Sequence, residues 1–502
     1  MKKLTALICV ALCLFSLFAA SVRPLVNVKP YFTYDNTPSG FDSDDAGLVW
    51  DLKDNWFFRR QDYWLKGFET PSFLDLGLEA TTDNLRLVML FDLGQDHLAR
   101  MKDSGDIFLN VPFMGAPIDL SFPSVGFVEY TSSDGNFFAS IGRRQIKWGP
   151  ATYDMAIGDS QPYLDNLYLT QDFPFGDNGW SFWFNFIGIW YKYFLNYGQE
   201  NWLGPQSTFS HKFGFENDNF RITFAELNQV YNKYPSLLDF TPLGVWHDNY
   251  QDEFSNVMLN VSVEGLVGPV RLFGSFTMDD FDQGREIDPT YGISDKPQAM
   301  GFIAGAEINL LDGKSLESFE FTPSDYMIRE KTFKKDTGLN LGYEFFLCTN
   351  FMYNRNDTAG MFASPFQFFS FACGYVSEGD AFYLGFKYGP GTKVHRFYAE
   401  YTDSPIQAGL SVELITRGSY GLGSTYGDKP ALAAMGIKPM ELYGPLTQAI
   451  KVEGSLVWQL QKGFKATAQL GYTADLTHGT GAFNARVGAQ IAIPDVDWSH
   501  LF

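Results

Sequence analysis

Cysteine is scarce in this sequence. Of the four cysteines among 502 residues, Cys9 and Cys13 lie in an apolar N-terminal segment that we expect to be removed. Cys348 and Cys373 remain, on two expected strands that are close in sequence. They could form one disulfide or stay as two unpaired thiols, and the sequence leaves both states open.

Long hydrophobic runs are absent beyond the N-terminal segment. No uninterrupted apolar stretch reaches the length of about 18 residues that a membrane-spanning helix requires. Positive charge is in deficit too, because 37 Lys and Arg face 58 Asp and Glu, a formal net charge of −21. That balance argues against nucleic acid or anionic lipid as the main partner.

Metal-binding patterns are also lacking. The six histidines are scattered, and none forms an HExxH or a paired zinc motif. An acidic run at residues 42–45 begins like a calcium loop, but Ala46 and Lys53 occupy two of its ligand positions. Three later acids could hold calcium in a surface loop or form a cation filter, namely Asp279, Asp280 and Asp282. We expect no metal and no cofactor.

The first 20 residues predict an export signal. Lys2 and Lys3 precede an apolar run at residues 4–18 and the small residues Ala19 and Ala20, which is the layout of a secretory signal peptide. Removal of residues 1–20 makes the net charge more negative by a further two. A lipoprotein with Cys13 as the lipidated residue would need a different small-residue context before it. We therefore expect an exported chain without a lipid anchor.

Strands with one apolar and one polar face form the dominant pattern. In residues 85–93 (LRLVMLFDL), one side carries only apolar residues and the other carries Arg86 and Asp92. The same period of two returns at 257–265, 465–475 and 483–493. Because side chains of a strand alternate between two faces, each segment meets lipid on one face and water on the other. An aromatic share of 17% suits the aromatic girdles of membrane barrels.

These segments predict an all-β fold, a transmembrane antiparallel β-barrel of about 18 strands of the outer-membrane type. Hairpins are expected with turns at 133–135 and 265–268. We assign the barrel to residues 73–493, preceded by a periplasmic or lumenal segment at 21–72 and followed by a C-terminal tail at 494–502. Long connections are expected at about residues 95–123, 149–179, 231–252, 279–298, 311–336 and 418–449.

The most distinctive motif lies at residues 142–166, where a strand reading Gly-Arg-Arg-Gln-Ile-Lys runs into Trp148-Gly149-Pro150. A Gly-Arg-x-Gln strand followed by Trp-Gly-Pro resembles the capsule assembly Wzi family of outer-membrane barrels. Residues 240–282 resemble the family's polar and aromatic loop before a strand that ends in Asp-Asp-Phe. The resemblance implies a partly plugged barrel of about 18 strands that holds surface polysaccharide without cleaving it. The family's periplasmic helical bundle has no counterpart among helix-period segments of this chain.

The candidate ligand-binding residues come from this motif and are Arg143, Arg144, Gln145, Lys147, Trp148 and Asp159. Sugar hydroxyls suit arginine, amide and acid groups, and the apolar face of a sugar ring suits tryptophan. Equally, Arg143, Arg144 and Lys147 could line the lumen in pairs with Asp and Glu of neighbouring strands. Trp148, near a strand end, could instead belong to the aromatic belt at the membrane interface.

The leading hypothesis is a non-enzymatic barrel, in contact with lipid of the bacterial outer membrane, that binds or anchors surface polysaccharide. A porin-type diffusion channel would share the signal peptide and the wall but have an open path. An esterase is a third hypothesis, because Gly158-Asp159-Ser160 resembles the GDSL nucleophile block and Asp497 and His500 have the spacing of its partners. That chemistry needs an α/β fold, whereas alternating strands fill the interval between the two motifs. The oligomeric state stays open.

Overall fold

The computed structural model describes residues 21–37, 71–95, 107–110, 118–158, 164–176, 179–190, 206–231, 233–241, 246, 255–280, 298–316, 326–354, 362–370, 375–419 and 440–493. The expected signal peptide, Asp159, Ser160, Cys373 and the C-terminal tail lie outside these residues. Along the described parts of the chain, no helix is long and apolar enough to cross a membrane.

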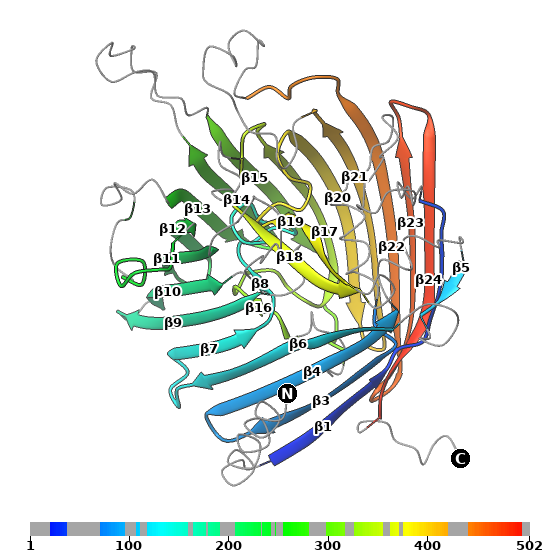
Figure 1. Ribbon diagram of the computed structural model, residues 1–502, viewed down its shortest axis with the longest axis horizontal. Coiled ribbons are helices and arrows are strands. Elements are labelled where there is room, and N and C mark those ends of the chain that lie inside the picture. The colour runs from blue at the N-terminus through cyan, green and yellow to red at the C-terminus, as the bar shows by residue number, and fades with distance from the viewer. Residues whose placement is uncertain are drawn as a thin grey trace.

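Eighteen antiparallel strands close into one barrel (Figure 1). Around the wall they are β1 (Ser21–Val28), β3 (Leu74–Thr81), β4 (Leu85–Gln95), β6 (Ile118–Thr131), β7 (Phe137–Arg143), β9 (Asp165–Phe175), β10 (Trp180–Trp190), β11 (Gln206–Glu216), β12 (Phe220–Tyr231), β13 (Ser255–Val267), β14 (Val270–Asp280), β15 (Ala299–Asn309), β17 (Gly338–Cys348), β20 (Thr392–Asp403), β21 (Ile406–Arg417), β22 (Thr447–Gln461), β23 (Phe464–Asp475) and β24 (Thr480–Ala492). Each strand pairs with the next in this order, and β1 pairs with both β3 and β24, which closes the ring. The predicted fold class and strand number are confirmed.

The first strand comes from the segment 21–72, which the sequence analysis placed at the periplasmic mouth or in the lumen. β1 pairs with β3 along all of its 8 residues, and its end meets β24. β2 (Tyr31–Asp35) then continues along β24, and the short β5 (Ile107–Leu109) pairs with β2. This part of the segment therefore belongs to the wall. Its strand pattern is hard to recognise because Pro24 and Pro30 interrupt it.

The two faces of the wall follow the predicted alternation. On β13 the inward side chains Asn260, Ser262 and Glu264 are buried, whereas Val263 between them is 42% exposed on the outer face. The lumen side is not uniformly polar, because Val88 and Leu90 of β4 point inward. They form a buried apolar cluster with Leu25, Val125, Phe127 and Tyr326.

Short turns and long connections fall largely as expected. The hairpins β6–β7 and β13–β14 are confirmed by their pairing. Several connections differ from the prediction. β5 and the first residues of β6 lie within the expected loop at 95–123. β9 occupies part of the expected loop at 149–179, and a long connection at 349–391, not predicted, links β17 to β20 and contains the hairpin β18 (Ala363–Ser370) and β19 (Tyr375–Tyr383). That hairpin has strand-like sequence, so sequence pattern alone cannot separate it from the wall.

Candidate functional site

A segment between β7 and β9, residues 144–158, folds into the lumen as a compact loop, which we call the plug loop. The backbone N–H of Trp148 donates to the carbonyl of Ile157 at 3.0 Å and closes it. The Asp154 carboxylate accepts from the backbone N–H groups of Ala156 and Ile157 at 2.7 and 3.0 Å. Burial raises the pKa of Asp154. The plug loop therefore has its own internal hydrogen bonds.

The plug loop is attached to several strands of the wall. The backbone N–H of Thr152 donates to Glu344 Oε1 on β17 at 2.7 Å, and Tyr153 OH donates to Glu413 Oε1 on β21 at 2.5 Å. The Arg271 guanidinium on β14 donates to a backbone carbonyl of the loop. Because these partners come from three separate strands, the plug loop bridges the inside of the barrel.

A second inner segment, residues 326–334, lies beside the plug loop. Its strand β16 (Ile328–Arg329) pairs in parallel with β8 (Ile146–Lys147) of the plug loop. Figure 1 shows this small pair within the ring of wall strands. Two connections that are far apart in sequence thus form one structure in the lumen.

Glu330 holds these segments to the wall. Its carboxylate accepts from Lys212 Nζ on β11 at 2.7 Å and from the backbone N–H of Gly149 at 2.9 Å. Burial acts to raise the pKa of Glu330, but Lys212 and Arg221 outweigh it and lower the pKa below its usual range. Glu330 is therefore an ionised carboxylate at the junction of three parts of the chain.

A third inner segment consists of residues 349–354 and 384–391, on either side of the β18–β19 hairpin. Tyr353 OH donates to the carbonyl of Met155 at 2.6 Å and accepts from the backbone N–H of Phe386 at 2.9 Å. Burial raises the pKa of Tyr353, so the hydroxyl keeps the proton that it donates. The φ angle of Tyr353 is 70°, which is uncommon for a residue with a side chain.

Cations lie against aromatic rings in this interior. Lys212 Nζ is 4.4 Å from the ring centroid of Trp148, and Lys387 Nζ is 4.7 Å from that of Tyr153. Trp148 is 1% exposed and Tyr153 is 8% exposed. These rings are therefore covered by protein, and their cation contacts stabilise the plug loop.

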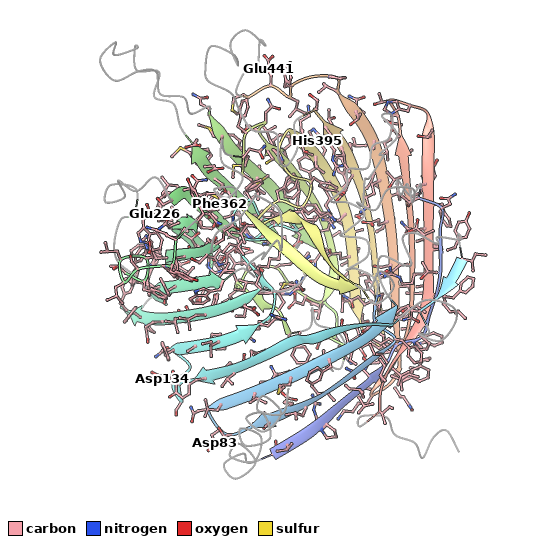
Figure 2. The ribbon with its side chains drawn as sticks, viewed as in Figure 1. Asp83, Asp134, Glu226, Phe362, His395 and Glu441 are labelled. Carbon is pink, nitrogen blue, oxygen red and sulfur yellow. The ribbon has the colours of Figure 1, made fainter. Side chains whose placement is uncertain are left out.

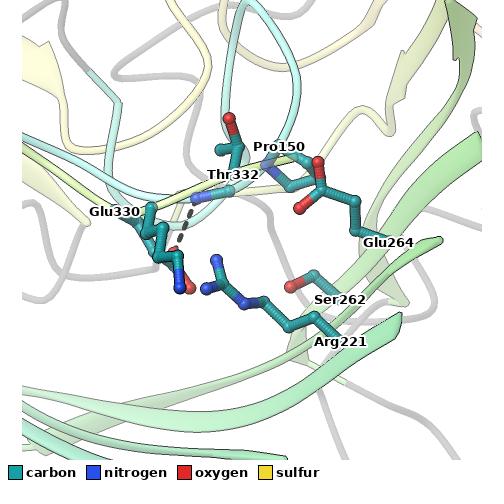
Figure 3. Close-up of a pocket in the computed structure, with 8 residues that line it drawn as sticks. Pro150, Arg221, Ser262, Glu264, Glu330 and Thr332 are labelled. Carbon is teal, nitrogen blue, oxygen red and sulfur yellow. Dashed lines mark hydrogen bonds between the residues drawn. The ribbon is translucent and has the colours of Figure 1, made fainter. Parts of the chain in front are cut away.

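A small cavity remains where the plug loop meets the second segment (Figure 3). Its volume is about 10 Å³, room for one water molecule at most. Arg221 and Glu330 enter it from opposite sides in Figure 3, and the other lining residues are Gly149, Pro150, Ser262, Glu264, Lys331 and Thr332. The cavity suits a water molecule among buried charges and is too small for a sugar ring.

The inner face of β22 and β23 is more accessible. Ser455 on β22 and Gln469 on β23 face each other on the lumen side, and both are exposed. The buried core of the plug instead involves inward residues from β9 to β22, such as Tyr168 and Ala449. The described lumen therefore has a filled side and a side with exposed polar groups.

The structure separates the two arginines of the sequence motif. Arg143 points outward, like Ile141 two residues before it, and forms two hydrogen bonds with Asp165 at 2.6 and 2.8 Å. Arg144 points into the lumen, is 4% exposed and donates from Nη1 to Glu129 Oε2 at 2.8 Å. Its guanidinium also lies 3.9 Å from the centroid of the Phe127 ring. Pairing with acids of neighbouring strands thus describes both arginines, but only Arg144 lines the lumen.

The remaining motif residues belong to the plug loop. The carbonyl of Gln145 accepts from Ile328 N at 3.0 Å, and Lys147 Nζ donates to the carbonyl of Thr152 at 2.7 Å. Trp148 is buried inside the barrel and is not part of an aromatic belt at the membrane interface. Asp159 lies outside the described residues.

Four residues that organise the lumen are not among the candidates predicted from the sequence, namely Lys212, Glu330, Tyr353 and Glu413. The strand period could have marked Lys212 and Glu413 as inward residues. No local signal links Glu330 to Gly149, 181 residues away, or Tyr353 to Met155, 198 residues away.

The alternative sites gain no support from the described residues. Asp279, one of the acids considered for calcium, accepts from Tyr353 N at 2.8 Å and from Asn256 Nδ2 at 3.1 Å. In the described ranges, no group of three His, Cys, Asp or Glu is placed to hold a metal ion. The esterase residues Ser160, Asp497 and His500 lie outside those ranges, as does Asp282.

The chain is similar to known proteins in its fold and not in its overall sequence. No protein-family model matches the chain, and no curated protein matches its sequence. Among solved structures, the chain is similar to Wzi of Escherichia coli, an outer membrane protein involved in group 1 capsule assembly and a carbohydrate-binding β-barrel. The TM-score is 0.50 and the identity 12%, over 97% of this chain and 87% of that chain. This similarity shows an outer-membrane barrel fold, as the sequence resemblance to the Wzi family predicted.

Two further solved structures are similar at lower TM-scores. OccAB4 of Acinetobacter baumannii has a TM-score of 0.40 and 10% identity, over 94% of this chain and 98% of that chain. OccK8 (OprE) of Pseudomonas aeruginosa has a TM-score of 0.39 and 8% identity, with the same shares covered.

Proposed function

We propose that this protein is a non-enzymatic outer-membrane barrel that binds or anchors surface polysaccharide. The observation that carries the proposal is the occupied lumen, where three inner segments fill the side between β9 and β22. A filled lumen suits a protein that holds a polymer better than one that passes solutes. The fold similarity to a carbohydrate-binding barrel points in the same direction.

The plug is tied to the wall by buried charged groups. Lys212 of β11 and Glu330 of the second inner segment form a buried ion pair at 2.7 Å. Glu344 and Arg396, themselves paired at 2.9 Å between two wall strands, both hydrogen-bond to Thr152 of the plug loop, at 2.7 and 2.9 Å. Removing one partner of such a pair leaves an uncompensated buried charge, which is strongly unfavourable. The inner segments therefore act as a fixed part of the barrel and not as a loosely held gate.

Within this proposal the motif residues act in two places, the plug loop and the outer face of the wall. Arg144, Gln145, Lys147 and Trp148 hold the plug loop through the contacts described above, whereas Arg143 stabilises the outer face with Asp165. Direct sugar contact by the motif, including Asp159, is the part of the proposal that a binding experiment has to test.

A diffusion channel is the second candidate function. The exposed polar side chains of Ser455 and Gln469, on the accessible side of the lumen, favour it. Single-channel recording in planar bilayers separates the two functions, because an anchor with a fixed plug should give no steady conductance. A large and steady conductance of the wild-type protein would contradict the plugged anchor and support the channel.

Binding of the refolded protein to an array of bacterial polysaccharides tests the leading function directly. We expect wild type to bind at least one polysaccharide and Arg144→Ala to bind more weakly. Arg143→Ala is the matched control, since it removes the neighbouring arginine from the outer face and should bind like wild type. Heat-modifiable migration in gels checks that each variant is folded. Absence of binding by wild type to any polysaccharide would count against the proposal.

A further inference from the structure

An ionisable pair lies on the outer face of the barrel wall. His211 of β11 and Glu226 of β12 are direct partners in the sheet and share their face with Phe224, which is 45% exposed to the outside. His211 Nε2 is 3.2 Å from Glu226 Oε2, and both residues are 5% exposed. Figure 2 labels Glu226 at the edge of the barrel. A polar pair on this face needs a cover, because the outer face of a membrane barrel meets lipid.

The cover comes from the connection between β12 and β13. Trp246 stacks on His211 with ring centroids 4.4 Å apart, and its backbone N–H donates to Glu226 Oε2 at 2.9 Å. Phe240 packs on Phe209 of the outer face with ring centroids 4.8 Å apart. We call residues 233–241 together with Trp246 the outer segment, since it folds back onto the outside of the wall.

The outer segment contains a tight turn with an apolar tip. Asp239 is buried, and its Oδ2 accepts from the backbone N–H and the hydroxyl of Ser236 at 2.6 and 2.9 Å. These bonds fix the turn and leave Leu237 and Leu238 at its tip, 89% and 73% exposed. Tyr234, just before the turn, is 75% exposed. Exposed large apolar side chains that are held in a fixed turn indicate a contact surface.

We propose that Leu237 and Leu238 insert into the outer leaflet of the membrane beside the barrel, so that the outer segment both covers the polar pair and contacts lipid. The tip is continuous with the lipid-facing wall, because Phe240 and Trp246 attach the outer segment to that face. The longer connections of outer-membrane barrels lie on the extracellular side, which places the tip at the outer leaflet. Tyr234 next to the tip has the amphipathic side chain that is enriched at membrane interfaces.

Collision measurements on a spin label test this proposal in phosphatidylcholine vesicles. Cysteine is introduced as Leu237→Cys, with Cys348 and Cys373 replaced by alanine, and labelled with a nitroxide. We expect oxygen, which concentrates in lipid, to relax the label more than a water-soluble nickel complex does. Val263→Cys on the outer wall gives the reference for lipid, and Asp134→Cys in a short exposed turn gives the reference for water.

Two outcomes would overturn the proposal. A label at position 237 that behaves like the label at 134 would place the tip in water. Spin–spin broadening that persists when the protein is diluted in excess lipid would show a second copy of the chain at the tip. Asp239→Ala in the Leu237→Cys protein serves as the matched variant. Loss of the turn should raise the relaxation of the label by the nickel complex relative to that by oxygen, while the barrel stays folded.

Discussion

Two neighbouring residues of β11 lie in different environments, one on the outside of the barrel and one in its lumen. His211 points outward and Lys212 points inward, and each is buried against a glutamate. The partner of His211 is Glu226 on the adjacent strand, whereas the partner of Lys212 is Glu330, 118 residues away. His211 is thus paired with the adjacent strand, whereas Lys212 is paired with a connection that returns from elsewhere in the chain. Other lumen groups also pair between adjacent strands, such as Arg271 with Glu264. Contacts between the wall and the plug are therefore less predictable than contacts between neighbouring strands.

The largest expected effect follows from removing Lys212. Lys212→Met leaves the ionised Glu330 buried without the ammonium group that is bonded to it, and breaking such a pair costs about 3–5 kcal/mol. We expect the urea unfolding midpoint of the refolded protein to fall accordingly and current through planar bilayers to become unsteady. The double variant Lys212→Met with Glu330→Leu removes both charges and should recover most of the loss. Equal stability of Lys212→Met and wild type would show that the lumen pair does not hold the plug.

A second prediction compares the two faces on one strand of the wall. Leu456 of β22 is 45% exposed on the outer face, and Ser455 beside it is exposed on the lumen side. Leu456→Arg places a charge in lipid and should cost about 2–4 kcal/mol. Ser455→Arg places the same charge in water and should change stability by less than about 1 kcal/mol. Unfolding in urea from lipid vesicles measures both, and similar losses would break the assignment of faces.

The wall and the plug also differ in how much of their structure the sequence predicts. The period of two in segments such as β4 and β13 depends only on which solvent each face meets, so the strands, their number and the outer-membrane fold could be predicted. The motif at residues 142–166 predicted residues of the lumen, and Trp148 and Lys147 do lie there. The interior of the plug could not be predicted, because Tyr353 with Met155 and Glu330 with Gly149 are pairs that only the closed barrel brings together.

A third prediction concerns the backbone of the plug loop. Gly149 has a φ of 72°, and a Cβ there would lie 2.2 Å from Asp154 Oδ2. Gly149→Ala therefore adds steric overlap to backbone strain and should cost about 1–3 kcal/mol. Gly135→Ala is the matched control, because Gly135 has a φ of 74° in an open turn with no atom within 4 Å of the added Cβ. A larger loss in the control than in Gly149→Ala would contradict the packing of the plug loop.

The smallest expected effect is a pH dependence of the stability, which arises from acidic groups in the lumen. Lys212 and Arg221 lower the folded pKa of Glu330 below 4.5, so its stabilising contribution is complete above pH 4.5 and is lost as the pH falls through the folded pKa. Asp154 acts in the opposite direction, because burial raises its pKa above 3.8 and protonation at low pH relieves that cost. Unfolding midpoints from neutral pH to below 4.5 should therefore fall more steeply in wild type than in Glu330→Gln, which lacks the contribution of Glu330 and keeps those of Asp154 and all other acids. Identical slopes for the two proteins would mean that the Glu330 carboxylate does not secure the plug.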